Sequence, residues 1–85
     1  MNIEEADKLI YDFKFQNRRL IEIQDAMLKA ESGILTVMVV GSSDMYFYAN
    51  QYEDEILYFL DSLNKAVTLE IEEIKIKLRK VGINA

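Results

Sequence analysis

The sequence has no cysteine, no proline, no histidine and no tryptophan, and only three glycines. Because cysteine is absent, disulfides and thiol chemistry are excluded, and the composition does not indicate a redox compartment. Because histidine is absent, the commonest general base and the commonest transition-metal ligand are missing. The absence of proline favours long uninterrupted helices. We therefore expect a helical protein that is not an enzyme and that carries no cofactor and no metal.

The chain is short and acidic, with 85 residues, a net charge of −5 and 51% hydrophobic residues. This length predicts one small domain, 1–85, which buries only a modest share of its surface. The negative charge disfavours binding to nucleic acid and to anionic membrane surfaces. The longest mainly apolar run, 34–40, is too short to span a bilayer, and no signal-peptide pattern precedes it. We therefore expect a cytoplasmic protein without membrane contact.

The first predicted helix covers residues 3–31. Apolar residues recur in it with steps of three and four, which is typical of an amphipathic helix. The recurring positions are Leu9, Phe13, Leu20, Ile23, Met27 and Ala30. Asn2 is the predicted N-cap, because Glu5 follows it at the spacing of a capping box. Gly33 is expected to end the helix in a left-handed turn.

The second predicted helix covers residues 51–81 and has the same type of start and stop signals. Asn50 is its predicted N-cap, with Glu53 three residues later, and Gly82 follows its last turn. Its apolar stripe consists of Ile56, Leu60, Leu63, Val67, Ile71, Ile74, Leu78 and Val81. Acidic residues gather at its start and basic residues at its end, where each sign opposes the partial charge of the helix terminus.

A β-hairpin is predicted between the helices, over residues 34–49. Its first strand, 34–40, is rich in β-branched residues, and its second, 45–49, is rich in aromatic residues. The segment between Gly41 and Asp44 has the composition of a turn. The predicted fold class is α+β, mostly α: long helix, β-hairpin, long helix (αββα). Because both strand faces are apolar, we expect cover on both sides.

Self-association is expected because the chain carries more apolar surface than two helices and a hairpin can bury. Both helices have apolar residues beside the main stripe. These flanking residues are Ile3, Ala6, Ile10, Ile21 and Leu28 in the first helix, and Leu57, Phe59, Leu69 and Ile76 in the second. A two-stranded hairpin is also only marginally stable alone. We therefore predict a dimer or larger oligomer whose helices form a bundle.

Aromatic residues of the hairpin are the best candidates for contact with a second protein. In a strand, Tyr46 and Tyr48 point to one side, while Phe47 points to the other. One face should therefore be core and the other a partner surface. Tyrosine is a good interface anchor, and nearby carboxylates can attract a basic partner. The predicted partner-binding residues are Tyr46, Tyr48, Asp44, Tyr52 and Glu53.

Arg18 and Arg19 form a compact basic cluster with two alternative interpretations. They could hold the phosphate of a nucleotide, with a tyrosine stacking on the base. Alternatively, Gln16 and Asn17 beside them lie near the apolar stripe, where a polar residue can set register or oligomer state. The second, structural interpretation is the one we favour.

Two other groups of residues could bind ions but have simpler interpretations. Glu70, Glu72 and Glu73 could hold Mg²⁺ and support a hydrolase. A solvated helix face, with an ion pair from Glu73 to Lys77, is the simpler explanation. The glycine and serines of 41–43 could form an anion-binding nest, although a hairpin turn explains them better.

In layout the whole chain resembles small, acidic, cysteine-poor proteins encoded by bacteriophages. The features that carry this resemblance are a helix, a short hairpin and a long closing helix with a Lys-rich last turn followed by Gly82 and Ile83. The resemblance implies a non-enzymatic inhibitor or adaptor of a host factor, acting in the cytoplasm of the bacterial host cell. Two alternatives stay open: an oligomer that sequesters nucleotides, and a structural assembly unit.

Overall fold

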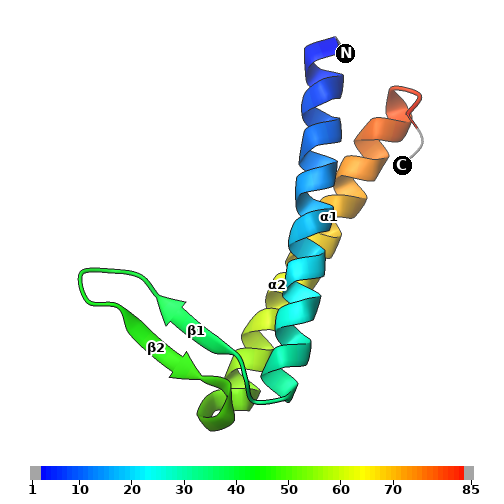
Figure 1. The fold of residues 1–85 in the computed structure, drawn as a ribbon. Helices are drawn as coiled ribbons and strands as arrows, with labels where there is room; N and C mark the ends of the chain where they lie inside the picture. Colours follow the sequence, from blue (N-terminus) through cyan, green and yellow to red (C-terminus); the bar gives the residue numbers. More distant parts are fainter. Residues whose placement is uncertain (1–2, 84–85) are drawn as a thin grey trace.

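Two long antiparallel helices joined by a β-hairpin make up the computed structural model, which describes residues 3–83 (Figure 1). The order is α1 (Ile3–Glu31), β1 (Thr36–Val39), β2 (Met45–Tyr48) and α2 (Ala49–Lys80). This confirms the predicted αββα fold class. Within the described residues, no helix combines the length and the apolar character needed to cross a membrane.

Both helices end at the predicted glycines. Gly33 has a φ of 73°, and its N–H donates to the carbonyl of Ala30 at 3.0 Å. The N–H of Ile34 donates to the carbonyl of Lys29 at 3.1 Å, which completes a Schellman motif. Gly82, with a φ of 84°, closes α2 with the same pair of hydrogen bonds, at 3.0 and 2.9 Å.

The start of α2 differs from the prediction. Asn50 is not its cap: the helix begins at Ala49, and the cap residue, Tyr48, makes no side-chain capping hydrogen bond. The N–H of Ala49 instead donates to the carbonyl of Leu35 at 3.0 Å, which continues the hairpin ladder to the first helical residue. The chain thus passes directly from strand to helix. Asn2, the cap predicted for the first helix, lies outside the described residues.

A kink at Tyr52 separates the first turn of α2 from the rest. Its backbone angles, φ −129° and ψ 40°, are not helical. The ring of Tyr52 meets the ring of Phe47 edge to face, with centroids 5.8 Å apart. Because the regular helix resumes after Tyr52, Glu53, Asp54 and Glu55 lie in its first turn, where the exposed N–H groups favour negative charge.

The core lies along the seam between α1 and α2. Its buried side chains are Ile23, Ala30, Ala49, Ile56, Leu60, Val67, Ile71 and Leu78. At the hairpin end, Ala30 and Ala49 are both fully buried, which lets the end of α1 approach the start of α2 closely. A second cluster around Ile23, Val67 and Ile71 holds the helices together farther along.

Replacing Gly33 with alanine should lower the free energy of unfolding by about 1–2 kcal/mol, because an L-residue resists the left-handed conformation. The added Cβ would lie 3.7 Å from the Cβ of Asn50, an ordinary contact, so the cost is conformational. Gly41→Ala is the matched control, since nothing lies within 4 Å of its added Cβ. Chemical denaturation measures both. An equal effect of the two substitutions would contradict the Schellman assignment.

Candidate functional site

The hairpin projects from one end of the helix pair, so its two faces have different surroundings (Figure 1). Val37 pairs with Phe47 on the inner face, and both pack against the core cluster at the start of α2. The other face, which we call the outer hairpin face, consists of Thr36, Met38, Tyr46 and Tyr48. All four of these residues are exposed.

This arrangement confirms that one hairpin face is core. The sequence left open which face it is, and the structure places Tyr46 and Tyr48 on the other one. The expectation of cover on both sides is wrong for a single chain. The outer hairpin face has no cover from the described residues, and Val39 and Met45 are exposed even on the inner face. The reason is geometric: only the base of the hairpin reaches α2, so the tip of the hairpin lies beyond it.

An apolar groove of about 390 Å³ lies between the inner face of the hairpin and the start of α2. We call it the hairpin groove. Its lining consists of Val37, Val39, Phe47, Tyr52, Glu55, Ile56 and Phe59. Glu55 is the only charged residue in this lining. The groove can therefore accept an apolar side chain with a basic neighbour, and it offers nothing to a phosphate.

Glu55 and Phe59 were not among the predicted site residues, although the sequence contains a signal for them. Tyr52, Glu55 and Phe59 are three and four residues apart, so a helix places them on one side. Phe59 was assigned to the self-association flank. This side of α2 borders a groove because of the angle at which the hairpin leaves the helix. Residue spacing within the helix does not predict that angle.

The predicted partner-binding residues gather at the hairpin end of the molecule but on two sides of it. Tyr46 and Tyr48 lie on the outer hairpin face, whereas Tyr52 lines the hairpin groove. Asp44 lies in the turn, where its Oδ1 accepts a hydrogen bond from the N–H of Gly41 at 3.3 Å. Glu53 is exposed just after the kink. The five residues therefore share one end of the fold and not one continuous patch.

The turn itself offers no open anion nest through Gly41, because the carboxylate of Asp44 occupies that N–H. A carboxylate at this position would also repel an incoming anion. The structure thus agrees with a hairpin turn for residues 41–44.

The basic cluster is not assembled into a phosphate site. The guanidinium of Arg19 lies over the ring of Phe15, 5.1 Å from its centroid. Arg19 also borders a groove of about 250 Å³ between the helices, together with the carboxylate of Glu22 and mainly apolar side chains. Arg18 lines neither this groove nor the hairpin groove. The two arginines therefore do not converge on one cavity.

A side-chain hydrogen bond crosses the helix seam. The Nε2 of Gln16 donates to Oε2 of Glu70 at 2.6 Å, while Oε1 of Gln16 is buried without a hydrogen-bond partner in the described structure. Asn17 acts only within its own helix, donating to the carbonyl of Phe13 at 2.8 Å. Of the two polar residues predicted to set register, Gln16 is therefore the one with a hydrogen bond that joins α1 to α2, at 2.6 Å.

The carboxylates of α2 point to separate partners. Glu70 receives the hydrogen bond from Gln16, and Glu72 pairs with Lys75 at 3.4 Å. The predicted ion pair between Glu73 and Lys77 is not formed. Within residues 3–83, no group of three or more acidic side chains is placed to hold a metal ion.

Comparison with protein-family models, with curated proteins and with solved structures found no match to this chain. Function is therefore inferred from the geometry and chemistry of the hairpin and the grooves.

Alanine substitutions should separate the two faces of β2. Phe47→Ala should lower the free energy of unfolding by roughly 1–3 kcal/mol, because the partly buried ring packs on the core cluster. Tyr46→Ala, on the neighbouring exposed position, should change it by less than about 0.5 kcal/mol. Denaturant titration of both variants tests this difference. Similar losses would mean that the outer hairpin face is covered in the folded protein.

Proposed function

We propose that this protein is a non-enzymatic binding protein that acts through contact with a second protein, using the outer hairpin face. The observation that supports this is the placement of Met38, Tyr46 and Tyr48. Each is about half exposed, at 49%, 54% and 50%, on a two-stranded arm that stands away from the helices. Folding leaves these large side chains uncovered, and burying them against a partner would be favourable.

The chemistry of this end of the molecule favours a basic partner surface with an apolar centre. Tyrosine brings a large apolar ring and one hydroxyl, which suits the centre of an interface. Glu53 and Asp54, exposed where α2 resumes, supply negative charge near the arm. Together with the net charge of −5, this field would speed association with a basic protein.

The biological role that we propose is inhibitor or adaptor of a host factor, in the cytoplasm of a bacterial cell. This role comes from the resemblance in layout to small phage-encoded proteins. A binding arm carried by a short helical body is compatible with it, because such a protein needs contact area and no catalytic centre.

The test uses affinity purification from bacterial lysate with the tagged wild-type protein and the Tyr46→Ala/Tyr48→Ala double variant. The captured partner is then titrated calorimetrically with each protein. Loss of the two interface anchors should raise the Kd by at least about 30-fold, since even one hot-spot residue contributes about 2 kcal/mol or more. Tyr11→Ala is the control, because Tyr11 is exposed on α1 and far in sequence from the hairpin.

An unchanged Kd for the double variant would overturn the assigned surface. A thermal shift of several degrees with a nucleotide, abolished by Arg19→Ala, would favour the sequestering alternative instead. The control variant should behave like the wild type in both measurements.

A further inference from the structure

The chain exposes far more surface than a compact protein of its size. Its accessible surface is 6478 Å² for a mass of 9.9 kDa. A compact monomer of that mass would expose about 5,200 Å². The radius of gyration, 16.5 Å, likewise exceeds the roughly 12 Å of a compact domain of this length. The excess of about 1,300 Å² is more than the roughly 800 Å² that each partner buries in a standard protein interface.

Large apolar side chains are exposed on the side of α2 that faces away from the core, which we call the α2 stripe. Its members are Tyr58, Phe59, Ser62, Ala66, Leu69 and Ile76, all exposed. The four large side chains are 77%, 52%, 62% and 49% exposed in that order. The opposite side of α2 carries the buried residues that meet α1. An exposed apolar stripe along a helix is the usual form of a surface that packs against another helix.

The two ends of α2 carry opposite charges that find no ion-pair partner in the described part of the chain. Glu53, Asp54 and Glu55 lie at the start, and the basic end consists of Lys77, Arg79 and Lys80. The ion pairs of the described residues involve other lysines, namely Lys29, Lys65 and Lys75. At 1.5 Å per residue, Glu55 and Lys77 are about 33 Å apart. One copy cannot bring these ends together, whereas a second copy can.

We propose that two copies form an antiparallel two-fold dimer through the α2 stripe. Antiparallel packing places the acidic start of each α2 against the basic end of the other, whereas parallel packing would oppose like charges. Glu55, Ala66 and Lys77 are spaced by eleven residues, about three helical turns, so they lie along one side of α2. With Glu55 opposite Lys77 of the second copy, the two-fold axis passes at Ala66. Its small side chain allows the two helices to approach closely.

This register also assigns an occupant to the hairpin groove. Ile76 of the second copy then lies at the level of Ile56 along the helix, within one turn of Phe59, the exposed groove-lining residue that also belongs to the α2 stripe. The lining of the groove is apolar except for Glu55. The segment of the second copy that lies near it carries the exposed Ile76 and, next to it, Lys77. The outer hairpin face stays free in this dimer, so the inference goes beyond the proposed function.

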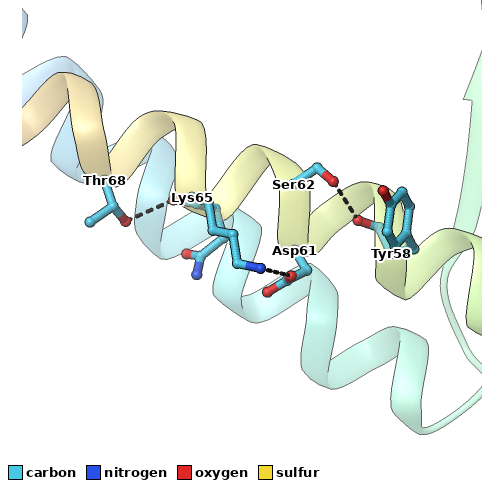
Figure 2. A network of polar contacts seen from close by, with 6 residues as sticks. Tyr58, Asp61, Ser62, Lys65 and Thr68 are labelled. Carbon is cyan, nitrogen blue, oxygen red and sulfur yellow. Dashed lines mark hydrogen bonds and ion pairs between the residues drawn. The ribbon is translucent and has the colours of Figure 1, made fainter.

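Three polar side chains on or beside the α2 stripe, those of Ser62, Lys65 and Thr68, already have partners within the helix, which lowers the cost of covering them (Figure 2). The hydroxyl of Ser62 donates to the carbonyl of Tyr58 at 3.0 Å, and Lys65 pairs with Asp61 at 2.9 Å. Thr68 similarly donates to a carbonyl one turn back, at 2.7 Å. A second helix could therefore cover the stripe without leaving these hydroxyl donors unpaired.

The exposed apolar residues of α1 make a weaker self-complementary surface. Ile3, Ile21 and Leu28 are exposed, but none of them lines the hairpin groove or the groove beside Arg19. The basic residue in the last turn of α1, Lys29, already pairs with Asp25 at 2.9 Å. An antiparallel pair of α1 helices would thus lack the free opposite charges that α2 offers.

Disulfide trapping tests the arrangement cleanly, because the natural chain has no cysteine. Chains with Glu55→Cys are mixed with chains carrying Lys77→Cys under mild oxidation. The mixture should give a covalent heterodimer, and neither variant alone should crosslink, since like positions lie far apart in an antiparallel pair. Leu28→Cys serves as a matched control on α1 and should not join either partner. Crosslinking of each variant to itself would show parallel packing and overturn the proposal.

Charge reversal with mass measurement gives an independent readout. By sedimentation equilibrium the wild type should have twice the 9.9 kDa mass. Lys77→Glu should raise the dissociation constant of the dimer at least tenfold, which corresponds to about 1.4 kcal/mol of binding free energy. Adding Glu55→Lys should restore it, because the reversed pair is again complementary and the net charge returns to −5. Lys14→Glu, with the same charge change on α1, should have no comparable effect.

A wild-type mass of 9.9 kDa at micromolar concentration would overturn the dimer. So would a Lys77→Glu defect that Glu55→Lys does not repair. Either result leaves the outer hairpin face and its partner untouched, since the Tyr46→Ala/Tyr48→Ala titration tests that function separately.

Discussion

The apolar seam between α1 and α2 is the contact on which the rest of the structure depends. It buries one row of side chains from each helix and includes two fully buried alanines, Ala30 and Ala49, at the hairpin end. This contact fixes where the hairpin leaves the helix pair and where α2 begins. A single seam in an 85-residue chain cannot cover the other sides of either helix, because each helix offers apolar residues around more than one stripe.

The exposed features follow from this limit. Only the base of the hairpin rests on the core cluster, so the arm presents Tyr46 and Tyr48 outward and leaves a groove beneath its inner face. On α2, the residues turned away from the seam form an apolar stripe between an acidic start and a basic end. The same shortage of internal cover thus yields two exposed surfaces. We propose that the arm binds a different protein and that the stripe binds a second copy.

Local sequence signals predicted the elements well where a single residue type decides the geometry. Gly33 and Gly82 mark the helix ends because few other residues tolerate the left-handed turn. The alternation of Tyr46, Phe47 and Tyr48 predicted that one side of β2 meets the core and the other does not, but it left open which side. These features are determined by residues that are close together in the sequence, so they can be predicted from local residue patterns.

Predictions failed where contacts distant in sequence compete with a local signal. Asn50 has the residue type and spacing of a cap, yet the helix begins at Ala49, two residues before the predicted start, where the N–H of Ala49 donates to the carbonyl of Leu35. The groove beside Tyr52 depends on how the hairpin leans against α2, which no residue spacing encodes. Similarly, Arg18 and Arg19 are neighbours in sequence but point to different surroundings, as adjacent helical residues do.

The central claim is that the outward side of α2 is covered in solution by a second copy while the hairpin arm stays open. Hydroxyl-radical footprinting at increasing protein concentration measures this residue by residue. The account predicts that Tyr58, Leu69 and Ile76 become protected as concentration rises, whereas Tyr46 and Tyr48 remain reactive. Equal reactivity of both groups at every concentration would contradict it.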